Sequence, residues 1–116
     1  MSKQEKSWGT SEELHRDAAR RVCVIDVQAG GRCSLHLHRF MTNIFVVTNG
    51  ELHVTVWDED ATHTVRRLTA GDSLIVAAGQ PHQFVAQTDV TAYEVYHAVR
   101  GPLDPEDIYR RPSSAP

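Results

Sequence analysis

Turn residues interrupt this chain about every eight to twelve residues, and this spacing leaves little room for helices. The interruptions lie at 29–31, 49–50, 58–60, 70–72, 78–81 and 87–89. Between them are short runs rich in Val, Ile, Leu, Thr and aromatic residues, at 22–27, 44–47, 52–57, 64–68, 74–76 and 90–99. Short β-prone runs with regular turns are typical of all-β sandwiches and barrels. The sequence therefore predicts an all-β fold.

Two local signals give more detailed predictions. The pair Asn49-Gly50 tolerates the positive φ angles of a tight turn, so we expect a hairpin between 44–48 and 51–57. One helix candidate covers 11–20, with Thr10 as a possible cap and Glu13 at the capping-box position, although this segment could equally be an irregular lead-in.

The length of 116 residues allows one domain. We expect a lead-in over 1–21, a barrel over 22–100 and a C-terminal tail over 101–116. The tail carries four prolines and ends in Ser113-Ser114-Ala115-Pro116, so it is predicted to fray. Cys23 and Cys33 are too few for a disulfide framework and are expected to be buried free thiols.

The charge balance argues against polyanionic partners. With 12 basic and 15 acidic residues the net charge is −3, which gives no electrostatic reason to expect nucleic acid or an acidic membrane as a partner. No apolar run approaches the roughly 20 residues that a membrane helix needs. Residues 1–21 are polar where a signal peptide would be apolar, so a cytoplasmic protein is expected.

Seven histidines are many for so short a chain, and two of them are placed to act together. His36 and His38 are two residues apart in a β-prone run, so their side chains should share one face. His82 follows the turn at 79–81 and could direct a third imidazole to the same place. Two histidines can also alternate by chance on an exposed strand. Three imidazoles, however, suit a divalent transition metal, and we expect Zn, Fe, Mn or Ni rather than Ca or Mg.

The spacing around the first two histidines resembles the first motif of the cupin superfamily. That motif runs Gly, five residues, His, one residue, His, three or four residues, Glu, six residues, Gly. Its positions fall on Gly30, His36, His38, Asn43 and Gly50 of this chain. Asn43 therefore stands where the family has Glu.

The second cupin motif is matched in spacing as well. It runs Gly, five residues, Pro, one residue, Gly, two residues, His, three residues, Asn. Here its positions fall on Gly71, Ala77, Gly79, His82 and Ala86, with Ala77 in place of Pro and Ala86 in place of Asn. The resemblance implies a cupin-type double-stranded β-helix, or jelly-roll barrel. It also implies His36, His38 and His82 as metal ligands, with the amide oxygen of Asn43 as a possible fourth.

Three segments are similar to the cupin domain of type II mannose-6-phosphate isomerases. They are Ser7-Trp8-Gly9, the run 34–50 with its Leu35-His36-Leu37-His38 core, and Pro102-Leu103-Asp104-Pro105-Glu106-Asp107-Ile108. In that family a Trp-Gly pair opens the domain and an acidic, Ile-ending segment follows the last strand. This likeness implies an isomerase that acts on a sugar phosphate.

The last strand offers the polar groups that a proton transfer would need. Tyr93 and His97 share one face, whereas Glu94 lies on the other with Tyr96, and the sequence does not say which face lines the barrel. Glu94, Tyr93 and His97 are the predicted catalytic residues. The arginines that could meet an anionic substrate are Arg32, Arg39, Arg66, Arg67 and Arg100.

The predicted function is that of a small-molecule enzyme in which a divalent metal acts as a Lewis acid, with sugar-phosphate isomerisation as the favoured reaction. One alternative is a non-haem iron dioxygenase, because three histidines without a carboxylate leave positions open for substrate and oxygen. Another is a non-catalytic cupin that binds or senses a ligand in its barrel. Sheet edges and exposed aromatic residues also lead us to expect a homodimer.

Overall fold

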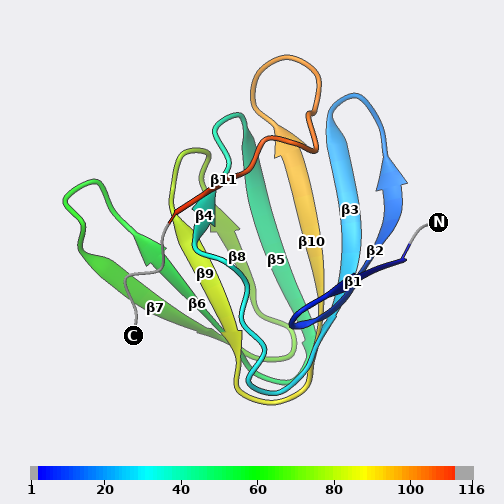
Figure 1. Cartoon of the computed structure of the whole chain (residues 1–116), viewed down its shortest axis with the longest axis vertical. Coiled ribbons are helices and arrows are strands. Elements are labelled where there is room, and N and C mark those ends of the chain that lie inside the picture. The colour runs from blue at the N-terminus through cyan, green and yellow to red at the C-terminus, as the bar shows by residue number, and fades with distance from the viewer. Residues whose placement is uncertain (1–2, 112–116) are drawn as a thin grey trace.

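Two antiparallel sheets face each other in the structure, a computed structural model that describes residues 3–111 (Figure 1). The first sheet consists, in spatial order, of β1 (Lys3–Lys6), β2 (Gly9–Arg16), β3 (Arg20–Val27), β10 (Val90–Ala98), β5 (Met41–Asn49) and β8 (Ser73–Val76). The second consists of β11 (Tyr109–Arg110), β4 (His36–Leu37), β9 (His82–Ala86), β6 (Leu52–Trp57) and β7 (His63–Leu68). Residues 3–111 contain no helix, so the predicted all-β jelly roll is confirmed.

The core lies between the sheets and follows the alternation of the strands. In β6, Leu52, Val54 and Val56 are buried while the residues between them are partly exposed. Phe45 of β5 and Phe84 of β9 pack edge to face in this core, with their ring centroids 6.1 Å apart. Burying such a side chain contributes about 1.5–3 kcal/mol to stability. Cys23 and Cys33 are buried free thiols, as expected.

The predicted hairpin around Asn49-Gly50 is wrong. Both edges of β5 are already paired, with β10 on one side and β8 on the other, so β6 has no edge of β5 to join. The chain instead crosses at Gly50 into the second sheet, where β6 pairs with β7 and β9. Gly50 has a φ of 88°, and a Cβ there would lie 2.1 Å from the carbonyl oxygen of Asp89. A tight turn does occur at Asn49-Gly50, as predicted, but it joins a strand of one sheet to a strand of the other.

The helix candidate at 11–20 is also wrong, because most of this segment forms β2. That strand pairs with β3 along its length, with Ser11 opposite Ile25 and Glu13 opposite Cys23. Glu13 contacts Arg21 across the pair at 2.9 Å, so its carboxylate serves an interstrand ion pair instead of a helix cap. The predicted lead-in thus adds two strands, β1 and β2, to the first sheet.

The predicted C-terminal tail is described as far as residue 111, and residues 109–110 of it form a strand paired with β4. After β10 the chain turns back over the end of the barrel and reaches β4, beside which β11 lies (Figure 1). Tyr109 pairs with Leu37 and Arg110 with His36. This packing was not visible in the composition of the segment, because its contacts are with residues about seventy positions earlier. Residues 112–116 lie outside the described residues.

Candidate metal centre

Two neighbouring strands of the second sheet place the three histidines. His36 lies in β4 and His82 begins β9, and the two are directly paired across the strands. His38 follows β4 immediately. The turn before β9 is held against it, since the backbone N–H of Gly79 donates to the carbonyl of His38 at 2.6 Å. Both predicted motifs therefore meet at one place through the backbone.

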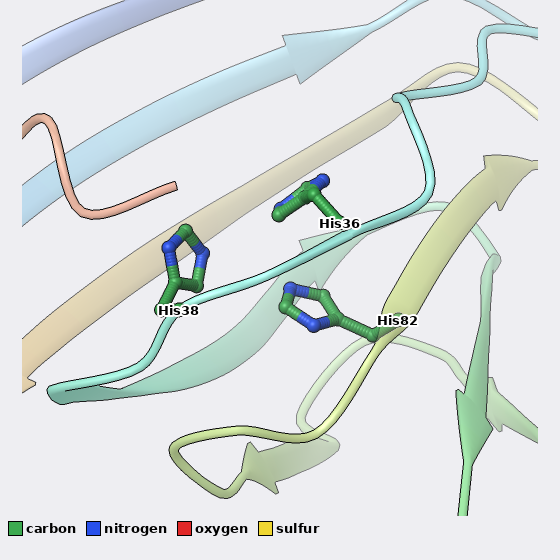
Figure 2. Close-up of side chains that lie close together, drawn as sticks. All are labelled: His36, His38 and His82. Atoms are coloured by element: carbon green, nitrogen blue, oxygen red, sulfur yellow. The ribbon is translucent and has the colours of Figure 1, made fainter. Parts of the chain in front are cut away.

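All three imidazoles are buried and point toward one another (Figure 2). Their ring centroids are 4.5 Å apart for His36 and His82, 5.0 Å for His36 and His38, and 5.4 Å for His38 and His82. One nitrogen of each ring lies within 4.8 Å of the others. Small rotations of the rings would bring these nitrogens to the distance of about 2.0–2.1 Å at which one transition metal binds imidazole.

The backbone fixes which nitrogen of each ring is free. Each Nδ1 lies within hydrogen-bond distance of a backbone carbonyl oxygen, which can only accept, so Nδ1 carries the proton. These carbonyls belong to Ser34, 2.7 Å from His36, to Asp107, 2.7 Å from His38, and to Gln80, 3.0 Å from His82. The Nε2 atoms are thereby left with their lone pairs, which is the form that binds a metal.

Three fully buried side-chain atoms at this place lack a hydrogen-bond partner among the described residues. They are Nε2 of His38, Nε2 of His82 and Oδ1 of Asn43. A buried polar group without a partner costs about 1–3 kcal/mol. All three are electron-pair donors, so a bound cation would satisfy them. The residues present therefore fit a metal ion.

Electrostatics keep two of the imidazoles neutral. Burial lowers the pKa of His36 to about 4, and the neighbouring His38 lowers it in the same direction. Burial lowers the pKa of His82 to about 3, helped by His36. At neutral pH both rings are therefore uncharged and ready to ligate.

Asn43 and Glu94 are held together beside the histidines. Nδ2 of Asn43 donates to Oε2 of Glu94 at 3.1 Å, and the hydroxyl of Tyr96 donates to the same oxygen at 2.9 Å. The Tyr96 ring contacts His38 edge to face, with centroids 5.4 Å apart. Burial raises the pKa of the Glu94 carboxyl, and the hydrogen bonds from Asn43 and Tyr96 oppose that shift. A carboxyl group thus lies near the imidazoles although the motif position holds Asn.

The structure does not bring Tyr93 and His97 to this place. Along β10 the buried residues alternate with exposed ones, and Glu94 and Tyr96 are on the buried side. Tyr93 and His97 point outward from the opposite face. Period-two alternation separated the two sets correctly, but it could not say which set faces in. Tyr96 was missed as a site residue, although its shared face with Glu94 was the signal that could have found it.

A pocket of about 630 Å³ adjoins His36 and His38. Its basic lining residues are Lys6, Arg16, Arg21 and Arg110, and its acidic ones are Glu94 and Glu106. Glu13 neutralises two of the cations, because its carboxylate contacts Arg16 at 2.6 Å and Arg21 at 2.9 Å. Lys6 and Arg110 take part in no ion pair within residues 3–111, so they remain available to a ligand.

None of the arginines expected to meet a substrate lines this pocket. Arg39 instead lies over the ring of Tyr109, and Arg100 over that of Phe40. Arg110 was overlooked because it lies in the segment that was expected to fray. Its strand pairing with His36 is what brings it to the site.

Known structures with the same fold include oxalate decarboxylase from Bacillus subtilis, determined at pH 4.6. It superposes with a TM-score of 0.82 at 16% identity, over 94% of this chain and 29% of that chain. A second oxalate decarboxylase structure, concerned with substrate binding and a reaction specificity switch, gives 0.83 at 16% identity over 95% and 30%. At this identity the likeness shows the fold alone. The present chain spans less than a third of those chains.

A comparison with curated protein sequences found no match. The family model of the cupin domain, by contrast, matches residues 23–97, a stretch that includes all three histidines and the whole of both motifs. This match covers well over half of the chain, and the two-sheet architecture agrees with it. The protein belongs to the cupin family.

Proposed function

We propose that this cupin is a metal-dependent enzyme that acts on a small anionic molecule. His36, His38 and His82 would hold the metal through their Nε2 atoms, and the adjoining pocket would hold the substrate. The observation that carries the proposal is the set of three buried imidazoles whose Nδ1 atoms are all engaged by backbone carbonyls. A divalent metal in such a site acts as a Lewis acid on a substrate oxygen.

The charge of the pocket supports an anionic substrate. Lys6 and Arg110 line it without an acidic partner in the described part of the chain, and a bound dication would add to their positive potential. An Arg guanidinium binds carboxylate and phosphate groups in a bidentate manner. Oxalate decarboxylase acts, by its name, on a small carboxylate. The likeness to sugar-phosphate isomerases makes a phosphorylated sugar the first substrate class to test.

Glu94 is the group that we propose to move a proton in the reaction. It lines the pocket, is buried, and is held in place by Asn43 and Tyr96. Both hydrogen bonds end on Oε2, so the other carboxyl oxygen carries no bond from this pair. An isomerisation needs such a positioned acid or base beside the polarised carbonyl. Tyr93 and His97 face outward and have no part in this proposal.

A second candidate function is that of a non-haem iron dioxygenase. The observation that favours it is the amide of Asn43 at the motif position of a carboxylate, which leaves three neutral imidazoles as the ligand set. Such a set keeps positions open for a chelating substrate and oxygen. Oxygen consumption that requires Fe(II) would support this function over the isomerase.

The test begins with metal. Untagged protein would be titrated with Zn(II), Mn(II), Ni(II) and, without air, Fe(II), and each loaded form assayed with sugar phosphates by NMR and in an oxygen electrode. The proposal predicts tight binding of one of these metals and turnover of an anionic substrate. Protein that binds metal and anions but turns over none of them would be a binding or sensing cupin. Protein that binds no metal would contradict the proposal.

A further inference from the structure

One residue of the C-terminal segment contacts a histidine of the metal centre and the two residues that follow it. Asp107 lies between β10 and β11, in the stretch that crosses to β4 in Figure 1. Asp107 is buried, with 4% of the residue's surface exposed, although Asp104 and Glu106 near it are exposed. A buried carboxylate is costly unless its oxygens accept hydrogen bonds. The hydrogen bonds of Asp107 therefore show why its carboxylate is buried at this place.

Both the side chain and the main chain of Asp107 accept hydrogen bonds from residues 38–40. Its carboxylate accepts the backbone N–H of Arg39 through Oδ1 at 2.9 Å and that of Phe40 through Oδ2 at 2.8 Å. Its backbone carbonyl accepts Nδ1–H of His38 at 2.7 Å. The side chain thus anchors the segment to the residues after His38, while the main chain bonds to the His38 ring itself.

We propose that Asp107 is a positioning residue for His38 and, through it, for the metal centre. The two charge-assisted bonds of its carboxylate hold the 107 carbonyl at a fixed place relative to the 38–40 backbone. That carbonyl selects the Nδ1–H form of His38 and sets the direction of its ring, so that Nε2 faces the other histidines. The C-terminal segment is then a functional part of the centre. This inference rests on the metal site of the proposed function.

Other contacts hold the segment independently of Asp107. The N–H of Leu103 donates to Ala18 at 2.7 Å, and that of Arg111 to Leu35 at 2.8 Å. The guanidinium of Arg39 lies 4.3 Å from the centre of the Tyr109 ring. Removal of the Asp107 carboxylate should therefore loosen the 107 carbonyl locally and leave the barrel folded.

The experiment compares Asp107→Ala and Asp107→Asn with Asp104→Ala. Asp104 is the matched control, because its Oδ1 accepts only the nearby N–H of Glu106 within the same segment. Dissociation constants for Co(II) and Zn(II) would be measured by competition with a chromogenic chelator. Loss of a partner that orients a ligand typically weakens metal binding about 10–100-fold, and we expect this for Asp107→Ala.

Asp107→Asn should lie between the wild type and Asp107→Ala, because the amide keeps one acceptor but directs its own N–H groups at the second backbone donor. Asp104→Ala should bind as the wild type does. The visible spectrum of the Co(II) protein should change in the Asp107 variants alone, since it reports the arrangement of the ligands. A purely structural role would change the stability to urea but not this spectrum.

A second readout needs no metal. Nitrogen-15 shifts of the His38 ring in the metal-free protein should show the Nδ1–H form in the wild type and a mixture of both forms in Asp107→Ala. Unchanged ring shifts and unchanged dissociation constants would overturn the inference. If Asp107→Ala does not fold, the same comparison with Asp107→Asn decides it. Failure of the wild type to bind metal would instead contradict the proposed function. The nitrogen-15 shifts of the His38 ring would then be the test of the role of Asp107.

Discussion

His36 and His82 are direct partners in the ladder between β4 and β9, with ring centroids 4.5 Å apart. Forty-five residues separate them in the chain, so the sheet, and not a local turn, brings them together. Paired strands hold side chains more rigidly than loops do. The distance between these two imidazoles is therefore a property of the barrel, which suits a preformed metal site.

We expect each of the changes His36→Ala, His38→Ala and His82→Ala to weaken metal binding strongly, because one of three imidazoles is lost. Chelator competition with Zn(II) measures this. His97→Ala is the control, since His97 faces outward from β10. A change in affinity for the control equal to that of the site variants would contradict the assignment of the ligands.

Arg110→Gln should reduce the binding of anions to the metal-loaded protein, because the guanidinium lines the pocket next to His36. A hydrogen bond to a charged group contributes about 1.5–3 kcal/mol, so a loss of roughly 10–100-fold is expected. Calorimetric titration with oxalate and with inorganic phosphate measures it. Arg66→Gln, at an exposed residue of the edge strand β7 that does not line the pocket, should have no such effect. Equal affinities in the two variants would exclude Arg110 from anion binding.

Asn43→Glu should destabilise the metal-free protein, because it brings a second carboxylate to within hydrogen-bond distance of Glu94. Added Zn(II) should restore much of that stability, since a dication between the carboxylates offsets their repulsion. Asn43→Ala only removes the hydrogen bond to Glu94 and should lose about 1–3 kcal/mol. Urea unfolding with and without Zn(II) checks this. A Zn(II) effect on Asn43→Glu no larger than on Asn43→Ala would mean that position 43 faces away from the metal.

The ion pairs of Glu13 predict a specific pH dependence. Its contact with Arg16, followed by that with Arg21, lowers the pKa of the Glu13 carboxyl from 4.5 to about 2. The ionised form is favoured in the folded state, so its stabilisation is present above pH 4.5 and disappears as the pH falls toward 2. Glu13→Gln should thus be less stable than the wild type at pH 7, and the two should converge near pH 2. Glu12→Gln controls for the loss of one charge. A constant difference between Glu13→Gln and the wild type across this range would contradict the prediction.

Local pattern predicted much of the barrel. Turn spacing and β-prone runs identified six strands, at 22–27, 44–47, 52–57, 64–68, 74–76 and 90–99, and period-two alternation placed His36 and His38 on one face. The errors came where tertiary pairing decides the outcome. Asn49-Gly50 marks a turn in either case, but only the occupied edges of β5 show that it joins two sheets.

The parts of the site that sequence could not supply depend on contacts distant in the chain. Asp107 reaches His38 across 69 positions, and Arg110 reaches His36 through β11. Burial alone shows that Glu94 faces inward while Tyr93 does not. The particular substrate, the homodimer and the cytoplasmic location stay predictions.

The most direct test of the account is the metal content of untagged protein, determined by elemental analysis after dialysis against trace metal. The wild type is predicted to retain about one transition-metal ion per chain, as a single three-imidazole site requires. The double variant His36→Ala, His38→Ala should retain almost none while keeping its β-sheet circular dichroism. A wild-type protein without metal, or a double variant with full occupancy, would contradict the assignment of these histidines as a metal centre.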